Sequence, residues 1–323
     1  MKVLVTGGAG YIGAHVTRAL AEAGHTPIVL DDLRCATRAR VGAFAHAAVA
    51  CEDTAALVEV LRRHRPDGVV HLAGYISVGE SVRDPDKYWA NNLAAAASLL
   101  LACARHPVQA LLFSSTAAVY GNAAVSPIRE DAPMAPTSPY GSSKLAFERL
   151  LHGSAAALGL RSAALRYFNA AGAHPAWGVG EAHTPEEHLI PRVIAALRAG
   201  RPVQVYGDDY PTADGTCERD YIHVSDLASA HVAVLSAADL PSGVSFNVGT
   251  GHGTSVRQVI ETIGRRLGVA ATLEVLPRRP GDPASLVADP SALHAAVGWQ
   301  PRHSQLPEIV DSAVEWELSR STT

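Results

Sequence analysis

The apolar positions in the first half of the chain form short continuous runs, separated by longer stretches with helical spacing. Short apolar runs are typical of strands buried on both faces, and apolar residues three or four positions apart are typical of helices packed on such a sheet. The pattern therefore predicts strands and helices in regular alternation. The expected strands are Val3–Thr6, Ile28–Leu30, Val69–Leu72, Ala110–Ser114 and Ala163–Tyr167, and the expected helices are Ile12–Ala23, Thr54–His64, Pro85–Arg105 and Tyr140–Leu158.

This alternation predicts an α/β fold with a doubly wound parallel sheet of the Rossmann type, because strands that alternate with helices form parallel βαβ units. After residue 168 the segments become shorter and contain more Pro, Gly and Asp. We therefore predict a Rossmann domain over residues 1–168 and a smaller C-terminal α/β lobe over residues 169–323. A strip around residues 217–247 is a candidate for crossing back onto the first domain.

Composition and charge exclude several classes of protein. The 323 residues are 48% hydrophobic, and their net charge of −4 is spread without a long basic block. Such a chain can bury a sizeable core, and it lacks the basic patch that nucleic-acid binding requires. The longest apolar, Ala-rich stretch without a charged residue, Leu93–Ala104, is too short to span a bilayer. Because the first residues lead directly into a strand, we expect no signal peptide, no membrane contact and a cytoplasmic protein.

The cysteines and histidines do not form a recognisable metal or disulfide pattern. The four cysteines are scattered without a CxxC pair, and the fifteen histidines include no HExxH arrangement. We therefore expect neither a disulfide framework nor a metal site.

A glycine-rich segment follows the first strand and opens the first helix. Gly7–Gly13 has the spacing GxxGxxG, which lets the backbone turn tightly and approach a pyrophosphate at the helix N-terminus. Asp31, at the end of the second strand, can accept hydrogen bonds from both ribose hydroxyls of NAD and would repel the 2′-phosphate of NADP. The motif predicts NAD binding. The alternatives are a glycine-rich turn without a ligand, and NADP bound with the help of Arg34 or Arg38.

Tyr140 and Lys144 lie four positions apart on an expected helix, so both side chains project from one face. A free tyrosine has a pKa of about 10, too high for a base at neutral pH, and a nearby ammonium group lowers it. Thr116, at the end of the fourth strand, adds a hydroxyl beside the same crevice. The group predicts removal of a proton from a sugar hydroxyl during oxidation. The alternative is an ordinary contact on a helix surface.

Several longer motifs resemble one family over nearly the whole chain. They are GGAGYIG, SSTAAVYG, SPYGSSK, LRYFNAAGAHP and YGDDYPTADGTCERDYIHVSDLA. In these segments the chain is similar to the UDP-glucose 4-epimerases, which are extended short-chain dehydrogenases/reductases. The resemblance implies reversible epimerisation at C4 of a UDP-hexose, through a transient 4-keto sugar and tightly bound NAD, with Tyr140 as the base.

The resemblance also implies a role for individual residues. It makes the first domain the NAD-binding domain and the C-terminal lobe the UDP-sugar-binding lobe. The implied cofactor-binding residues are Gly7, Gly10, Tyr11, Ile12, Gly13, Asp31, Asp32, Leu72, Ala73, Asn91, Ser114, Tyr140, Lys144 and Tyr167. The implied substrate-binding residues are Thr116, Tyr140, Asn169, His188, Leu189, Tyr206, Arg219, Arg279, Asp282 and Leu286.

The chain departs from the family at two positions near the cofactor. In the family, an acid usually follows a glycine after the third strand and contacts adenine. Here the matching stretch is Val49–Asp53, which contains no glycine, and Asp53 is a candidate helix cap instead. Many members have a lysine where this chain has Ile76. How adenine is held is therefore not defined by the resemblance.

Rival functions differ in the residues they require. A nucleotide-sugar dehydratase needs an acid–base pair just after Thr116, where this chain has Ala117 and Ala118. A non-catalytic NAD sensor could dispense with the Tyr–Lys pair. Among epimerases, the sugar could be glucose/galactose, their N-acetyl forms or a pentose. Leu286 aligns with a position that gates the sugar C2 substituent, which favours UDP-glucose and UDP-galactose. The alternative for Leu286 is that it packs in the core and does not face the sugar.

Relatives pair through two long helices, here Pro85–Arg105 and Tyr140–Leu158, so the resemblance implies a homodimer. The expected contact face of the first helix includes Leu93, Leu99 and Leu100.

Overall fold

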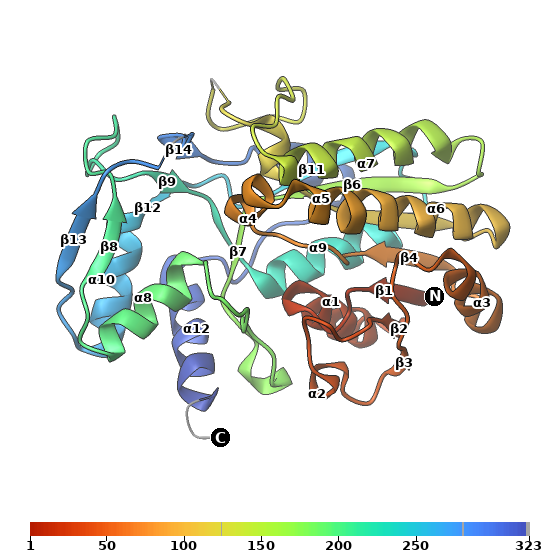
Figure 1. Ribbon diagram of the computed structural model, residues 1–323, viewed down its shortest axis with the longest axis horizontal. Coiled ribbons are helices and arrows are strands. Elements are labelled where there is room, and N and C mark those ends of the chain that lie inside the picture. The colour runs from red at the N-terminus through yellow and green to blue at the C-terminus, as the bar shows by residue number, and fades with distance from the viewer. Residues whose placement is uncertain (124, 280, 321–323) are drawn as a thin grey trace.

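The computed structural model describes residues 1–123, 125–279 and 281–320. Within these residues the largest sheet has seven strands, all paired in parallel (Figure 1). In order across the sheet the strands are β11 (Val244–Val248), β6 (Arg161–Tyr167), β5 (Ala110–Thr116), β4 (Gly68–His71), β1 (Lys2–Thr6), β2 (Thr26–Leu30) and β3 (Ala45–Ala47).

The strand order places a crevice at the middle of the sheet. The chain runs outward from β1 through β2 to β3, then returns to β4 and runs outward in the other direction through β5 and β6. The connections on the two sides therefore cover opposite faces. In such sheets, ligands bind beyond the carboxyl ends of the strands where the direction reverses, here between β1 and β4.

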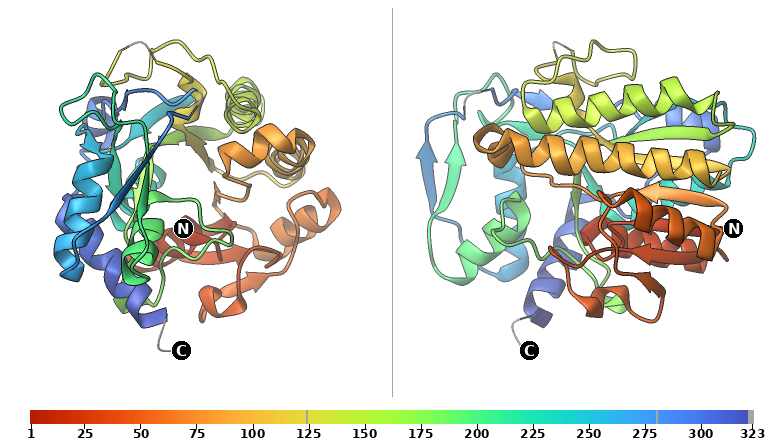
Figure 2. Two further views of the ribbon diagram at one scale, coloured as in Figure 1. Left: turned by 60° about the vertical axis from the view of Figure 1, so that its left-hand side comes forward. Right: turned by 45° about the vertical axis from the view of Figure 1, so that its right-hand side comes forward.

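Helices cover both faces of this sheet. One core contains Leu57, Leu99, Phe113 and Phe147, and the other contains Val5, Leu20, Leu165 and Leu227. On the first face lie α3 (Thr54–His64), α6 (Ala95–Arg105) and α7 (Pro139–Ala155), and on the second lie α1 (Tyr11–Glu22), α9 (Val224–Ser236) and α11 (Ser291–Val297). Helices α6 and α7 run side by side (Figure 2).

A second group of elements packs around its own core, which includes Ile194, Val205 and Ile260. Its strands form small sheets, of which one pairs β8 with β13 and another contains β12, β9 and β14. The elements are α8 (Leu189–Arg198), β8 (Val203–Tyr206), β9 (Glu218–Arg219), β12 (Thr254–Ser255), α10 (Val256–Leu267), β13 (Leu273–Leu276), β14 (Ser285–Leu286) and α12 (Leu306–Arg320). The pair β7 (Asn169–Ala171) and β10 (Tyr221–His223) connects this group to the main sheet (Figure 1).

The remaining short elements join these layers. They are α2 (Arg38–Val41), α4 (Val78–Arg83), α5 (Pro85–Tyr88), the π-helical turn η1 (Trp89–Ala94) and the 3₁₀ turns η2 (Ala117–Tyr120) and η3 (Pro175–Trp177).

The α/β class and the doubly wound parallel sheet are confirmed, and each expected strand and helix is present. The helix expected over Thr54–His64 has those ends in the structure, and most of the other elements have shifted ends. The helix expected over Tyr140–Leu158, for example, is α7, Pro139–Ala155. The helix expected over Pro85–Arg105 is made of α5, η1 and α6. The sequence pattern did not predict β3. In and at the end of the strip around residues 217–247, α9 packs on the second face of the main sheet and β11 is its edge strand.

The expectation for the contact face of the long helix was wrong. Leu99 and Leu100 are buried against the sheet, and Leu93 packs on the same core. The large apolar side chains that this helix exposes include Leu101 and Trp89. None of the described helices is long and apolar enough to cross a membrane.

Candidate active site

A cavity of about 1490 Å³ opens at the carboxyl ends of the parallel strands. It is bordered by residues of the main sheet and by residues of the second group of elements, including α8 and β8. Most of the site residues expected from the sequence line it. These are Gly7, Gly10, Tyr11, Ile12, Gly13, Leu72, Ser114, Thr116, Tyr140, Lys144, Tyr167, Asn169, His188, Leu189, Tyr206, Arg219, Arg279 and Asp282.

The glycine segment forms a tight turn between β1 and α1. Gly7 has φ +66°, and a Cβ atom there would lie 2.7 Å from the backbone nitrogen of Ala73. A Cβ atom on Gly13 would lie 2.0 Å from the carbonyl oxygen of Gly7. Glycine is therefore required at both positions, and the backbone N–H groups at the start of α1 face the cavity without a side chain in the way.

Five of the expected residues are not among the described side chains that line the cavity. Asp31 supports the glycine turn, because its carboxylate accepts hydrogen bonds from the backbone N–H of Ala9 at 3.0 Å and of Leu33 at 2.9 Å. Asp32 forms an ion pair with Arg34 at 2.8 Å. Ala73 packs against the β1–α1 turn.

The other two residues outside the lining are Asn91 and Leu286. The Asn91 amide donates to the carbonyl oxygen of Lys87 at 2.8 Å and accepts from Arg34 at 3.3 Å. Leu286, on β14, is half-buried and packs on an apolar cluster that includes Tyr120 and Leu145. Leu286 therefore packs beside α7, the helix that carries the Tyr–Lys pair.

The Tyr140–Lys144 pair lies in the first turns of α7. Ser138 caps this helix by accepting from the backbone N–H of Gly141 at 3.2 Å, and Pro139 is its first residue. Lys144 is buried, and its ammonium group donates to the carbonyl oxygen of Ser114 at 2.9 Å. The helix start and the end of β5 therefore fix both side chains of the pair at the cavity wall.

The surroundings of the pair raise the pKa of Tyr140 and lower the pKa of Lys144, so they favour the neutral form of both side chains. Burial lowers the pKa of Lys144 to about 8, although Glu148 acts in the opposite direction. Burial also raises the pKa of Tyr140 above its ordinary value, while a hydrogen bond with Thr116 lowers it. At pH 7 the ammonium is still mostly charged, and an additional positive charge in the cavity would favour the tyrosinate.

A buried polar network supports the pair from behind. Glu148 lies one turn after Lys144 on α7, and its carboxylate pairs with Arg166 at 2.8 Å and accepts a hydrogen bond from Ser115. Arg166 also donates to the hydroxyl of Tyr120 at 2.8 Å. Since Ser115 and Arg166 belong to β5 and β6, this network connects α7 to two strands of the main sheet.

Cationic and aromatic groups gather where the second group of elements borders the cavity. Arg219 on β9 pairs with Asp282 at 3.0 Å, and the guanidinium of Arg279 lies 4.0 Å from the centre of the Tyr206 ring. Leu189 begins α8 next to His188. Forked guanidinium donors beside a flat aromatic ring suit a diphosphate joined to a base.

Sequence reasoning missed several residues of the cavity wall. Lys87 lines it, with its ammonium 3.9 Å from the centre of the Tyr75 ring and 2.7 Å from Glu80. Phe168, Glu181 and His183 also line it. The only sequence signal for the last two is their proximity to His188 in the segment GEAHTPEEH.

Residues 3–249 match the NAD dependent epimerase/dehydratase family, and the chain belongs to that family. The UDP-glucose 4-epimerase of Azospirillum brasilense is 47% identical over 321 residues, which are 98% of this chain and 92% of the relative. Within the family, the chain is a member of the UDP-glucose 4-epimerase group, as its motifs predicted.

Solved structures of the group have the same fold. The crystal structure of the UDP-glucose 4-epimerase from Brucella ovis in complex with NAD is 43% identical, with a TM-score of 0.94 over 97% of each chain. The enzyme from Stenotrophomonas maltophila, with bound NAD and formylated UDP-arabinopyranose, is 38% identical, with a TM-score of 0.96 over 100% of this chain and 99% of the other.

Proposed function

We propose that this protein is an NAD-dependent epimerase that interconverts UDP-glucose and UDP-galactose by inverting the configuration at C4. The observation that carries the proposal is the position of Tyr140 and Lys144. They line the same cavity as the glycine turn, Arg219 and Arg279. One continuous space thus brings together a dinucleotide cradle, a proton-transfer pair and cationic groups for a diphosphate.

The residues at the glycine turn fit NAD. The space that a Cβ atom would occupy at Gly7 and Gly13 is taken by backbone, so the turn presents bare N–H groups to a pyrophosphate. Asp31 holds this turn through Ala9, and its negative charge disfavours a 2′-phosphate. The chemistry that bound NAD supplies is reversible oxidation at C4 of the sugar, with no net redox change over one turnover.

The chain's own residues handle the proton and the orientation of the sugar. Tyr140 accepts the proton of the sugar 4-hydroxyl and returns it to the same oxygen at the end of the turnover. Lys144 stabilises the tyrosinate by its charge, and Thr116 shares the sugar hydroxyl as a hydrogen-bonding partner. The arginines hold the diphosphate, which leaves the sugar free to turn about its link to it.

Dehydratase activity is disfavoured by the residues that follow Thr116. Elimination of water needs an acid and a base near C5 and C6 of the sugar. Here Ala117 and Ala118 stand at that point, in the turn η2 that the Thr116 hydroxyl caps through the Ala118 N–H at 3.2 Å. Two methyl groups cannot move protons, so the site supports oxidation at C4 alone.

The test is to incubate the purified protein with UDP-galactose, without added NAD, and to follow the products by NMR. We expect UDP-glucose to form, and we expect acid-denatured protein to release NAD. A cofactor-free protein that stays inactive with added NAD would contradict the proposal. Release of NADP would show that Arg34 or Arg38 overrides Asp31, and a 4-keto-6-deoxy product would identify a dehydratase.

For the choice of sugar, we predict that UDP-glucose and UDP-galactose are turned over faster than their N-acetyl forms. Leu286 offers bulk but no hydrogen-bonding group, and burying an acetamido group without partners costs about 1–3 kcal/mol. Leu286→Tyr should abolish any N-acetyl activity while sparing UDP-galactose, and Leu286→Cys should raise it. Parallel changes on both sugars, or none, would show that Leu286 only packs against the cluster around Tyr120.

For the assembly, we predict a homodimer that buries the exposed faces of α6 and α7. Leu101 on α6 is 57% exposed and Leu150 on α7 is 39% exposed, and Trp89 lies exposed on the same helical run. Light scattering at micromolar concentration should give twice the monomer mass. Leu101→Arg combined with Leu150→Arg should give the monomer mass with an unchanged circular dichroism spectrum. A wild-type protein with the monomer mass would exclude the dimer.

A further inference from the structure

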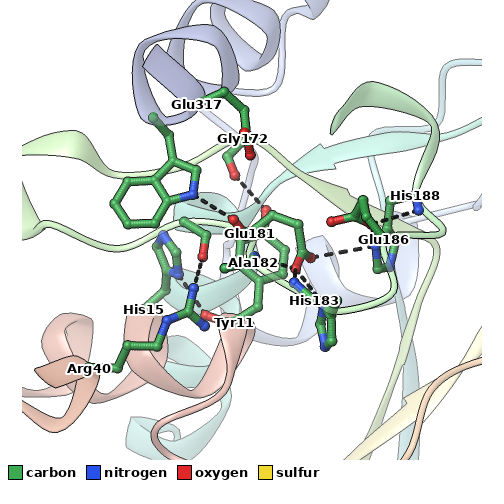
Figure 3. Close-up of polar contacts among 12 residues, drawn as sticks. Tyr11, His15, Arg40, Gly172, Glu181, Ala182, His183, Glu186, His188 and Glu317 are labelled. Atoms are coloured by element: carbon green, nitrogen blue, oxygen red, sulfur yellow. Dashed lines mark hydrogen bonds and ion pairs between the residues drawn. The ribbon is translucent and has the colours of Figure 1, made fainter. Parts of the chain in front are cut away.

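The segment from Gly180 to Leu189 crosses from the glycine turn to α8, and side chains from distant elements hold it. The carbonyl oxygen of Glu181 accepts from the indole N–H of Trp316 at 2.6 Å and from Arg320 at 3.2 Å. Arg40 donates to the carbonyl oxygen of Gly180. The acceptors are backbone carbonyl oxygens of the segment, so these side chains hold the segment in place without forming hydrogen bonds to the Glu181 carboxylate (Figure 3).

Three possible metal ligands converge within this segment. The side chains of Glu181, His183 and His188 turn toward one another, and one ligand atom from each lies within 4.8 Å of the other two (Figure 3). The Nδ1 atom of His188 lies 3.7 Å from Oε2 of Glu181, and Nδ1 of His183 contacts Oε1. All three residues line the cavity, so an ion could reach them.

Of the two carboxylate oxygens of Glu181, Oε1 accepts hydrogen bonds and Oε2 does not within the described residues. The residue is 6% exposed, and Oε1 accepts from the backbone N–H of Ala182 at 2.7 Å and of His183 at 2.9 Å. Oε2 is buried and has no hydrogen-bond partner within the part of the chain that the structure describes. A buried carboxylate oxygen without a donor is unfavourable, and this one faces the ring of His188.

We propose that Glu181, His183 and His188 bind one divalent transition-metal ion, with Zn²⁺ as the best match. Two imidazoles and one carboxylate, with a further position open to the cavity, are a ligand set that Zn²⁺ accepts, whereas Mg²⁺ and Ca²⁺ prefer oxygen ligands alone. The ion supplies the missing partner of Oε2. It also links the start of the segment that leads into α8 to the end of that segment.

The geometry requires only side-chain adjustment. Tetrahedral ligands at ~2.1 Å from zinc lie roughly 3.4 Å apart, so donor atoms that lie up to 4.8 Å apart must approach by at most roughly 1.4 Å. The side chains of His183 and His188 are 36% and 40% exposed and have room to turn. The carboxylate of Glu186 lies 2.6 Å from Nδ1 of His188 and must give up this contact when the ring turns toward an ion. The hydroxyl of Tyr11 donates to the carbonyl oxygen of Gly172 at 2.6 Å, so it does not compete.

The proposal is tested by titrating the chelator-treated protein, with its cofactor content measured, with Co²⁺ and Zn²⁺. We expect one equivalent of Co²⁺ to give visible absorption bands of a four- or five-coordinate site, and Zn²⁺ to displace it. Glu181→Gln and His183→Gln should each weaken Zn²⁺ binding at least tenfold in calorimetry. His183 is partly exposed, so its variant should fold even if the buried Glu181 variant does not.

Glu187→Gln is the matched control. It removes the same charge from the same segment, and Glu187 bonds Ser77 rather than the cluster. We expect its Zn²⁺ affinity to equal that of the unchanged protein. The proposal fails if the unchanged protein takes up no Co²⁺, or if His183→Gln binds Zn²⁺ as tightly as the unchanged protein. The second result would assign the binding to histidines elsewhere on the surface.

Discussion

Tyr140→Phe is expected to lower kcat for UDP-galactose by about a hundredfold or more while leaving the NAD content unchanged. The substitution removes the hydroxyl that we propose as the acceptor of the proton of the sugar 4-hydroxyl, and the ring still fills the same space on α7. A hundredfold loss corresponds to about 2.7 kcal/mol of activation free energy. The measurement is steady-state kinetics, with NAD determined after acid denaturation of the same sample.

Two further substitutions separate the roles of the neighbours. Thr116→Ser keeps the hydroxyl and should have a mild effect, whereas Thr116→Val removes it and should reduce kcat. Lys144→Met should lose activity and also weaken NAD binding, because we propose that the ammonium, held at the cavity wall by the Ser114 carbonyl oxygen, acts on both the tyrosine and the cofactor. If Tyr140→Phe kept near-full activity, another group would be the base, and the assignment of this pair would be wrong.

The parts of the fold that could be predicted are those whose signal is local. Val3–Thr6 and Ala110–Ser114 are buried apolar runs, and their burial depends on little beyond their own composition. β3 is three residues long and has no apolar run, so its pairing with β2 is decided by tertiary contact. β11 pairs with β6, far away in the chain, and nothing in Val244–Val248 indicates that partner.

In the candidate site, too, the features with a local sequence signal could be predicted and those decided by tertiary contact could not. The glycine turn and the Tyr140–Lys144 pair are fixed by spacing along one turn or one helix, so the sequence was sufficient to predict that these groups face one crevice. Direction around a helix is harder to predict where both faces are apolar. Leu99, Leu100 and Leu101 are consecutive, and only packing against the sheet decides that Leu101 is the exposed one.

The cluster around Glu181 could not be predicted because distant residues create it. The spacing from Glu181 to His183 and His188 differs from CxxC and HExxH, the spacings typical of metal sites. The burial of the carboxylate depends on a segment held by Arg40 and Trp316, which lie on α2 and α12.

Glu148→Ala is expected to lower the free energy of unfolding by about 3–5 kcal/mol, a large share of the roughly 5–15 kcal/mol typical of a folded domain. The side chains of Glu148 and Arg166 are 3% and 4% exposed, and their charged atoms lie 2.8 Å apart. Removing the carboxylate leaves the buried guanidinium without its ion-pair partner, and it also removes the acceptor of the Ser115 hydroxyl. Urea denaturation followed by circular dichroism gives the comparison.

The chain contains a matched exposed pair that isolates the effect of burial. Glu59 and Arg62 lie 2.7 Å apart, but their side chains are 58% and 63% exposed. Glu59→Ala should therefore leave the urea midpoint unchanged within error, because water replaces the lost partner. The double change Glu148→Leu with Arg166→Met removes both buried charges, and it should be less destabilising than Glu148→Ala alone. Equal changes in the urea midpoint for the Glu148 and Glu59 variants would show that water reaches the Arg166 guanidinium and that the polar network beside α7 is accessible to solvent.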